Sequence, residues 1–436
     1  MLPYAIWENV LERAGAHCQK TEGFISSAAF EVKQMKEVIC CRVCQSNQLE
    51  ELMDLGDQYL SDFREDDIKP PRFPLTLLLC KECFLVQLKH TVSPAYLYTE
   101  NYGYRSGING TIRSNLREIV EEVKSILCLQ AGDVVVDIGA NDGTLFEGYG
   151  ALPVKKIAFE PIAKLARLCK QHADEVVQDF FPQNTSPFSA KAITAISMFY
   201  DLDDPHRFLQ AVQETLALEG VFVIQQNYLG DMLKYNALDN IVHEHLEYYS
   251  LASLEFLLHR HELEVFRVVR TPINGGSFRT LIGHKGVRTV EESVQQMRRE
   301  EDRQGLKSQE PYQQFVKRVQ VEMKTLSSFI KEQKKLGKNI YLYGASTRGG
   351  SLMQFANLSA DEITAAVEKN EEKIGKKMSS LQIPIISEEE ARIRNPEYML
   401  VLPWFFKEEF LKREEKYLEQ GGTFIFPLPA FSLCSQ

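Results

Sequence analysis

The sequence contains no run of about 18 apolar residues, so no segment is long enough to cross a membrane as a helix. The first residues lack the unbroken apolar core of a signal peptide, because Glu8 and Glu12 interrupt it. A basic excess is also missing: the formal net charge is −10, which disfavours a nucleic acid as the substrate. These absences predict a protein of the cytoplasm that acts on neither a membrane nor a nucleic acid.

The composition is that of a globular protein of several domains. The chain has 436 residues, of which 44% are hydrophobic and 25% are charged. A chain of this length is too long for one hydrophobic core and predicts two to four domains. No short-period repeat and no low-complexity tract interrupts it.

Four of the nine cysteines form two CxxC pairs, Cys41/Cys44 and Cys80/Cys83. In a long chain without a secretion signal, paired cysteines indicate a metal site in a reducing compartment. Four thiolates complete a tetrahedral site with no open position, so we predict a structural Zn²⁺. The alternative is four unrelated buried cysteines, and Cys40 is a competitor for the ligand position next to it. Residues 45–79 between the pairs are acidic, which disfavours a nucleic-acid-binding zinc ribbon.

Apolar runs alternate with helical patterns from residue 112 onward. A helix over 112–130 is followed by strands expected at 134–139, 155–161, 192–199 and 220–227, with helices between them. This alternation predicts an α/β fold with a doubly wound parallel sheet.

Two further strands, 263–271 and 277–284, meet across Asn274, Gly275 and Gly276 and predict a hairpin at the edge of the sheet. A parallel sheet closed in this way is the usual outline of the class I methyltransferase core. The alternation of strands and helices resumes at 338–436 and predicts a second, smaller Rossmann-like domain.

The run VVVDIGANDGTLFEGYG (134–150) places Gly139 at the end of the first strand, where glycine lets a ligand approach the backbone. The run is not GxGxxG, but S-adenosylmethionine has no phosphate and needs no tight phosphate turn. Glu160 ends the second strand, roughly 20 positions later, where a carboxylate can accept both ribose hydroxyls. Asp179 can accept from the adenine amino group, and Phe180 can pack on the ring. The predicted cofactor site comprises Asp137, Gly139, Asn141, Asp142, Gly143, Glu160, Asp179 and Phe180; the alternative is a degenerate sheet without cofactor.

The segment NIVHEHLEYYS (240–250) places two histidines and a glutamate in a loop before a helix. A histidine can accept a proton near neutral pH, and a neighbouring carboxylate can orient it. The spacing is not HExxH, which excludes a zinc protease. We interpret His243 as a residue that caps or packs against the following helix, His245 as the candidate base and Glu244 as the group that positions it.

Taken together, these motifs resemble the sugar C-methyltransferases that act on nucleotide-linked 4-keto-deoxysugars. The resemblance covers about residues 39–436 and depends on the segments CRVC…LMDLGDQYLSDF…CKEC, ENYGYRSG, VVVDIGANDGTL, HEH–YYS, INGGSFR, YGASTRGG and LPWFFKEE. It implies carbon methylation: a base removes the proton beside the ketone, and the enolate attacks the sulfonium methyl group. His245 matches the family's base, Glu244 the preceding carboxylate and Tyr104 a tyrosine that lines the sugar pocket.

The resemblance also implies the remaining acceptor residues and the order of the domains. Gly344 to Ser346 lie where family members hold the nucleotide diphosphate, and Tyr102 and Tyr200 are placed in the acceptor site. The expected boundaries are an N-terminal extension (1–38), a zinc-binding domain (39–100), a methyltransferase domain (101–286), a helical connector (287–336) and a C-terminal Rossmann-like substrate-binding domain (337–436).

Three positions depart from the family pattern. Val242 replaces the tyrosine of a Tyr-x-Glu-His run, Asp201 stands where a histidine is frequent, and Phe405 replaces an asparagine. The first two departures remove donors to an enolate oxygen, a role that Tyr200 next door can take over. The sugar, the accepting atom and the choice between monomer and dimer stay open. An O- or N-methyltransferase of another small polar metabolite and a non-catalytic scaffold are the alternative functions.

Overall fold

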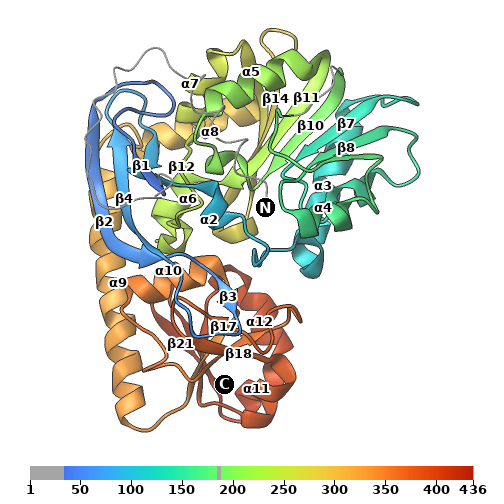
Figure 1. Ribbon diagram of the computed structural model, residues 1–436. Coiled ribbons are helices and arrows are strands. Elements are labelled where there is room, and N and C mark those ends of the chain that lie inside the picture. Colours follow the sequence, from blue (N-terminus) through green and yellow to red (C-terminus); the bar gives the residue numbers. More distant parts are fainter. Residues whose placement is uncertain (1–33, 184–187, 436) are drawn as a thin grey trace, which may run out of the picture.

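A computed structural model describes residues 34–183 and 188–435 of the chain (Figure 1). The N-terminal extension expected over 1–38 therefore lies, up to residue 33, outside the described residues. Its last residues form β1 (Met35–Glu37), which pairs antiparallel with β6 (His90–Val92).

The central sheet has seven strands in the order β13-β14-β11-β10-β7-β8-β9. Their bounds are β7 (Val134–Ile138), β8 (Lys155–Phe159), β9 (Glu175–Val177), β10 (Ala190–Ile196), β11 (Leu216–Asn227), β13 (Leu263–Thr271) and β14 (Ser277–His284). The strands are parallel except β14, which pairs antiparallel with both β11 and β13. The predicted parallel sheet closed by a hairpin is thus confirmed. The strand order reverses between β7 and β10, which is where open α/β sheets bind their ligands.

Helices surround this sheet, and all but α6 lie where the sequence pattern predicts a helix. They are α3 (Gly110–Ile126), α4 (Ala163–Cys169), α5 (Pro205–Thr215), α6 (Leu229–Lys234) and α7 (Leu251–His259). The helix expected at 144–149 is a 3-10 helix, η2 (Thr144–Tyr149), rather than an α-helix. Its short turn keeps the glycine-rich loop close to the end of β7.

The zinc-binding part is built on a four-stranded sheet in the order β12-β5-β4-β2. Three of its strands come from the N-terminal part, namely β2 (Leu49–Tyr59), β4 (Arg72–Cys80) and β5 (Val86–Leu88), and a short helix, α2 (Pro94–Leu97), follows them. The fourth strand, β12 (Glu247–Tyr248), directly follows the His-Glu-His loop. The zinc-binding part therefore fixes the end of the candidate catalytic segment.

The C-terminal sheet has eight strands in the order β21-β20-β19-β15-β16-β18-β17-β3. They are β15 (Ile340–Tyr343), β16 (Ala365–Glu368), β17 (Lys377–Met378), β18 (Ile383–Ser387), β19 (Tyr398–Val401), β20 (Thr423–Phe426) and β21 (Ser432–Cys434), joined by β3 (Phe63–Arg64) from the zinc-binding part. The helices are α10 (Thr347–Phe355), α11 (Glu388–Arg394), α12 (Lys407–Arg413) and α13 (Glu415–Glu419). The parallel core of β15, β16, β18, β19 and β20 has the expected Rossmann-like form.

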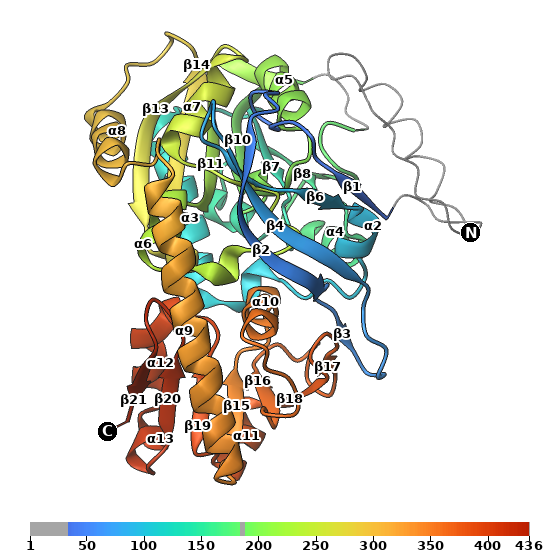
Figure 2. The same ribbon diagram turned by 90° about the vertical axis from the view of Figure 1, so that its left-hand side faces the viewer.

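Two helices, α8 (Glu292–Gln304) and α9 (Glu310–Lys335), occupy the segment expected to be a helical connector. Figure 2 shows α9 running along the molecule from the central sheet to the C-terminal sheet. Its buried residues recur every three or four positions, which gives it one apolar face. They are Tyr312, Phe315, Val319, Met323, Leu326 and Ile330.

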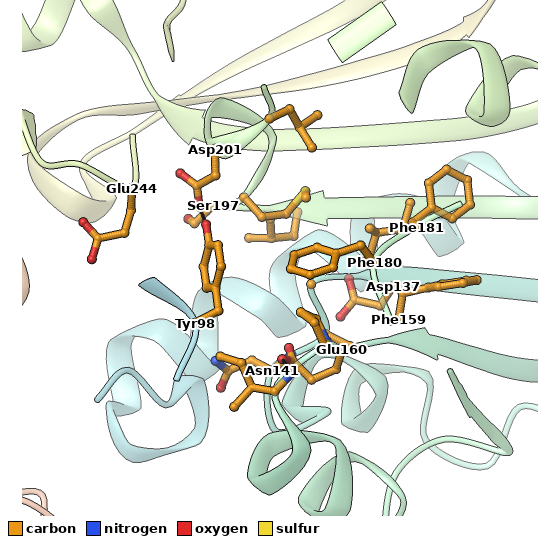
Figure 3. A pocket seen from close by; sticks show the side chains of 18 of the residues that line it. Tyr98, Asp137, Asn141, Phe159, Glu160, Phe180, Phe181, Ser197, Asp201 and Glu244 are labelled. Carbon is orange, nitrogen blue, oxygen red and sulfur yellow. Dashed lines mark hydrogen bonds between the residues drawn. The ribbon is translucent and has the colours of Figure 1, made fainter. Parts of the chain in front are cut away.

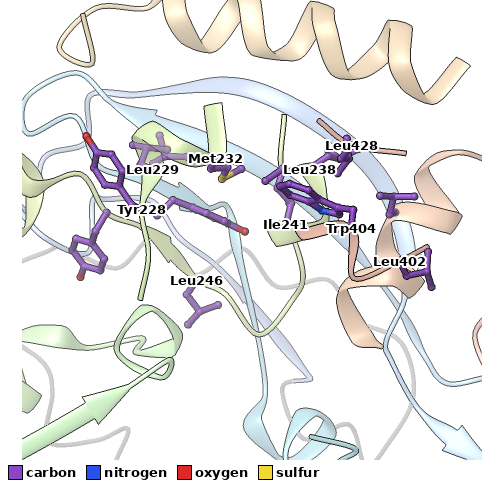
Figure 4. Packing of buried hydrophobic residues seen from close by; sticks show 14 of the residues in the cluster. Tyr228, Leu229, Met232, Leu238, Ile241, Leu246, Leu402, Trp404 and Leu428 are labelled. Atoms are coloured by element: carbon purple, nitrogen blue, oxygen red, sulfur yellow. The ribbon is translucent and has the colours of Figure 1, made fainter. Parts of the chain in front are cut away.

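The C-terminal domain packs directly on the segment that leads into the His-Glu-His loop. Figure 4 shows Leu402, Trp404 and Leu428 beside side chains from residues 228–246, and all belong to one buried cluster. Because these apolar side chains are buried together, they exclude water from the junction and hold the domains together. Among the described residues, no helix is both long and apolar enough to cross a membrane.

Candidate functional site

A cavity of about 540 Å³ lies at the carboxyl ends of β7, β8 and β10 (Figure 3). This volume is within the usual range for a small-molecule site. The predicted residues on its wall are Tyr102, Tyr104, Asp137, Gly139, Asn141, Glu160, Asp179, Phe180 and Glu244. The sequence pattern therefore identified residues that the fold brings together from distant parts of the chain.

The turn after β7 is locked to the end of β8 through Glu160. Gly139 and Asn141 have positive φ angles, 69° and 55°, which let the chain turn sharply after the strand. The Asn141 backbone N–H donates to Glu160 Oε2, and the Ile162 N–H donates to Oε1, both at 2.8 Å. Each carboxylate oxygen keeps capacity for a further donor, such as a ribose hydroxyl.

The cavity is strongly acidic. Its described lining residues include one basic side chain, Arg207, and seven carboxyl groups: Asp137, Glu160, Asp179, Asp201, Asp203, Asp204 and Glu244. Burial raises the pKa values of Asp137 and Glu160 to about 7, although Thr194 donates to Asp137 at 2.6 Å. An acidic cavity suits a cationic ligand, and S-adenosylmethionine carries a sulfonium and an ammonium group.

Two of the predicted cofactor residues, Asp142 and Gly143, do not line the cavity. Asp142 accepts from the Gly107 N–H at 3.0 Å and from the Thr144 hydroxyl at 2.6 Å, and it ion-pairs with Arg105 at 3.2 Å. It thereby ties the 3-10 turn η1 (Ser106–Ile108) to the glycine-rich loop. A Cβ atom on Gly143 would lie 3.0 Å from the Cys169 sulfur, so this glycine permits close packing of α4.

We expect Glu160→Gln to weaken binding of S-adenosylhomocysteine by roughly 10- to 100-fold, because hydrogen bonds to a charged acceptor are worth about 1.5–3 kcal/mol. Wild-type affinity should fall as the pH drops below about 7, since protonation removes the charged acceptor. Calorimetric titration measures both effects. Glu147→Gln is the control, because Glu147 pairs with Arg113 at 2.7 Å outside the cavity wall. Equal affinity in the Glu160 variant would remove this residue from the cofactor site.

His245 has a defined tautomer and stands in the chain between Glu244 and Leu246, which line the cavity, although neither His245 nor the predicted Tyr200 is on the cavity wall. Its Nδ1 is 2.9 Å from the Asn240 carbonyl oxygen, so Nδ1 carries the proton and Nε2 keeps its lone pair. The ring lies against Tyr200, with 4.3 Å between centroids. Burial, with a smaller contribution from the positive charge of Arg348, lowers the pKa of His245 to about 3. The imidazole is therefore neutral at physiological pH.

Glu244 and the tyrosines complete the acceptor side of the cavity. Glu244 lines the cavity, and its desolvation raises the pKa of its carboxyl to about 7. In the described parts of the chain it makes no hydrogen bond to His245, whose orientation comes from Asn240. The Tyr104 side chain is 46% exposed and so accessible on the wall. Tyr102 packs on Tyr98 with 5.9 Å between ring centroids.

His243 has the packing role that the sequence favoured, but on a different partner. It is buried, and its Nε2 lies 3.0 Å from the carbonyl oxygen of Phe73 on β4 rather than on the following helix. Burial lowers the pKa of His243 to about 4, so it too is neutral. This bond fastens the loop to the zinc-binding part.

The C-terminal domain reaches the site through Arg348, which the sequence pattern did not single out. Its guanidinium donates to the Asn274 carbonyl at 2.9 Å and pairs with Asp239 at 2.6 Å. Asn274 lines the cavity, and Asp239 precedes the Asn240 carbonyl that holds His245. Arg348 belongs to the motif YGASTRGG, but the sequence does not indicate that its side chain reaches Asn274 and Asp239.

The glycine-rich turn of the C-terminal domain does not line the large cavity. Gly344 has a positive φ angle of 95°, and the Ser346 hydroxyl caps α10 by accepting from the Gly349 N–H at 3.0 Å. A small crevice beside the start of α10 is lined by Thr347, Gly350 and Ser351, and also by Gln58 and Glu244. Glu244 thus lies on the walls of both the crevice and the cavity.

The four paired cysteines converge as predicted. The sulfur atoms of Cys41, Cys44, Cys80 and Cys83 all lie within 4.8 Å of one another, and backbone N–H groups of Val43 and Cys44 donate to the Cys41 sulfur. A tetrahedral set of four thiolates fits Zn²⁺ and leaves no position for a substrate. Cys40 is outside this cluster, and its sulfur lies 3.6 Å from the Gln45 side chain.

Comparisons with known proteins match three successive segments of the chain to family models. Sequence models of protein families match a zinc binding domain at residues 41–98, a methyltransferase domain at 105–268 and a C-methyltransferase C-terminal domain at 272–429. The chain is 30% identical to the C-methyltransferase NovU of Streptomyces niveus over 403 residues, covering 89% of this chain and 95% of that protein.

Similar solved structures include two methyltransferases. One is the O-methyltransferase of a Brevibacillus brevis trans-AT polyketide synthase with bound S-adenosylhomocysteine (13% identity, 42% of this chain, 75% of that chain, TM-score 0.32). The other is an S-adenosylmethionine-dependent methyltransferase of Clostridium acetobutylicum (13% identity, 40% of this chain, 91% of that chain, TM-score 0.32).

Proposed function

This chain belongs to the family of S-adenosylmethionine-dependent C-methyltransferases that carry an N-terminal zinc-binding domain, and from this we propose that its acceptor is a nucleotide-linked 4-ketosugar. S-Adenosylmethionine supplies an electrophilic methyl group when bound. The chain must then generate a nucleophilic carbon on the acceptor. The observation that carries the proposal is a neutral histidine of fixed tautomer whose two chain neighbours, Glu244 and Leu246, line a cavity that suits the cofactor.

His245 is proposed as the base that removes the proton next to the ketone. Its Nδ1–H is held by the Asn240 carbonyl, which leaves Nε2 to accept the proton. The proton leaves as the ketone becomes an enolate, and the enolate carbon then takes the methyl group. Tyr104 and Tyr102 form the wall against which the sugar ring packs.

The start of α10 is where the family resemblance places the nucleotide diphosphate, and the crevice there, of about 10 Å³, would have to open to admit it. The free N–H groups of a helix N-terminus favour an anion. Gln58 is only 3% exposed, and its Nε2 has no hydrogen-bond partner within the described ranges, so it is a donor available to a ligand. Glu244 borders both spaces. In this proposal the diphosphate lies at the start of α10, next to the predicted turn Gly344–Ser346, which does not itself line the crevice, and the sugar lies near Glu244.

We expect solvent deuterium to enter the carbon beside the ketone when the enzyme is incubated in heavy water with a nucleotide-linked 4-ketosugar and S-adenosylhomocysteine. Enolate formation exchanges this proton even though no methyl group is available. Mass spectrometry of the recovered sugar measures the exchange, and boiled enzyme is the control. If the enzyme methylates the same sugar when S-adenosylmethionine is supplied but does not exchange its proton, O- or N-methylation is favoured, because it needs no acidic C–H bond.

We also propose that the chain is divided into the extension, zinc-binding domain, methyltransferase domain, connector and C-terminal domain at the boundaries expected from the sequence. We further propose that the protein works in the cytoplasm. The four clustered cysteines, which suit a metal site rather than disulfides, support a reducing compartment. An O- or N-methyltransferase of another small polar metabolite is the second candidate, because Val242 and Asp201 stand where the family resemblance places donors to an enolate.

A further inference from the structure

One carboxyl group at the acceptor end of the cavity has surroundings that favour the neutral acid. Asp201 ends the 3-10 turn η3 (Phe199–Asp201) after β10 and lines the cavity together with Glu244. We propose that Asp201 is a catalytic residue that stays protonated and donates a hydrogen bond to the acceptor oxygen on which negative charge develops. This role rests on the proposed function, since it needs an acceptor whose oxygen becomes anionic.

The hydrogen bonds of Asp201 leave one oxygen atom unused. The Tyr98 hydroxyl donates to Oδ2 at 3.3 Å, as Figure 3 shows. Oδ1 is buried and has no hydrogen-bond partner in the described part of the chain. A buried carboxylate oxygen without a donor is costly, whereas a protonated Oδ1 becomes a donor that a ligand can satisfy.

The charged groups around Asp201 are negative, which favours the protonated form of its carboxyl group. Glu244 and Glu247 act on its carboxyl through their negative charges, and Tyr98 is the hydrogen-bonded neighbour. Tyr200, Tyr102 and Tyr248 are the other titratable groups that interact with it. Burial, followed by the charge of Glu244, raises the pKa of Asp201 well above its ordinary value.

Arg348, whose positive charge acts on Tyr200 and His245, does not cancel the effect on Asp201. Its guanidinium is bound to the Asp239 carboxylate at 2.6 Å and to the Asn274 carbonyl. Asp201 makes no ion pair with a lysine, arginine or histidine of residues 34–183 and 188–435. Its carboxyl therefore faces negative charge and apolar surface without a compensating cation.

The proposed step balances without any further reactant. The carbon beside the ketone loses its proton to His245 Nε2, and the electron pair moves onto the ketone oxygen. The Asp201 O–H donates to this oxygen but keeps its proton. The enolate carbon bonds to the methyl carbon as the methyl–sulfur bond breaks, its electron pair stays on sulfur, and the neutral thioether leaves. The carbonyl then re-forms, the hydrogen bond from Asp201 weakens, and His245 gives up its proton to water. A carboxylic acid kept neutral by its environment can stabilise an oxyanion in this way.

This assignment explains the departures from the family pattern. With Val242 in place of a tyrosine and Asp201 in place of a histidine, the site lacks both expected donors to the enolate. A protonated Asp201 restores one of them at the same position. The chain therefore keeps the capacity for carbon methylation despite the two substitutions.

The first test needs no acceptor. Infrared spectra of the full-length protein with S-adenosylhomocysteine, recorded between about pH 6 and pH 9, should contain a carboxylic-acid C=O band that is missing from Asp201→Asn. Asp203→Asn is the matched control: Asp203 lines the same cavity but pairs with Lys36 and Arg42, which lower the pKa of its carboxyl. The control should leave the band unchanged. Identical spectra for wild type and Asp201→Asn would overturn the proposal.

The second test uses the nucleotide-linked 4-ketosugar that exchanges deuterium. Asp201→Leu removes the donor and should lower kcat by about 10²–10³-fold, whereas Asp201→Asn keeps an N–H donor and should stay within about 10-fold of wild type. Wild-type activity should fall at high pH, as the raised pKa of Asp201 is passed, and the Asn variant should lack this decline. If Asp201→Asn binds cofactor but is as inactive as Asp201→Leu, the ionised form is needed and the proposal fails. If no ketosugar exchanges deuterium, the proposed substrate is wrong, whereas the infrared spectra still test whether Asp201 is protonated.

Discussion

Replacing His245 by asparagine should lower kcat by about 10²–10⁴-fold, the usual contribution of a general base. Asparagine can still donate to the Asn240 carbonyl and occupies a similar place beside Tyr200, so the local structure should persist. It cannot accept the proton that Nε2 accepts. Binding of S-adenosylhomocysteine should stay within a few-fold of wild type, because His245 is not on the wall of the cofactor cavity. Steady-state kinetics and calorimetry measure the two quantities.

Two residues, His245 and Glu244, are candidates for the base, and variants of each distinguish them. His259→Asn changes an exposed histidine in the last turn of α7 and should leave activity unaltered. The rival base is Glu244, because a carboxyl with a pKa of about 7 is well matched to proton abstraction near neutral pH. If His245→Asn keeps near-full turnover while Glu244→Gln loses it, Glu244 is the base and His245 only supports the loop.

Much of the fold was predictable because each element carries its own local pattern. The strand at 134–138 is a short apolar run that ends in glycine, and the hairpin near Asn274 combines β-branched strands with turn residues. Strands β3 and β12 were not predictable. Each has two residues, too few for a periodic pattern, and each pairs with a sheet from a distant part of the chain.

The cofactor side of the cavity followed from the sequence because its residues occur at set places after successive strands. Gly139 and Glu160 are examples, since the parallel sheet brings the ends of β7 and β8 together. Arg348 had no such signal. Its position beside His245 depends on how the C-terminal domain docks, which the apolar contacts of Trp404 and Leu402 determine and which no local pattern encodes.

Removing zinc should destabilise the zinc-binding part and should also abolish methyl transfer, although the metal has no open position. Structural zinc sites contribute on the order of 10 kcal/mol of binding free energy to the folded state. Cys80 ends β4, and the turn to Cys83 leads into β5. We expect Cys80→Ser to lose the metal, to lower the melting temperature and to increase protease sensitivity in residues 41–98.

The loss of activity follows from the pairing of β5 with β12. Val86 and Gln87 pair with Tyr248 and Glu247, and the Leu88 N–H donates to the Leu246 carbonyl at 2.9 Å, one residue after His245. When the turn at Cys80 loses its metal, this anchor for the His-Glu-His loop is lost. Zinc content by elemental analysis, thermal melting and turnover should therefore fall together. Cys128→Ser is the control, because Cys128 is exposed and outside the metal cluster. A zinc-free Cys80→Ser protein with full activity would show that the loop holds its position without the metal.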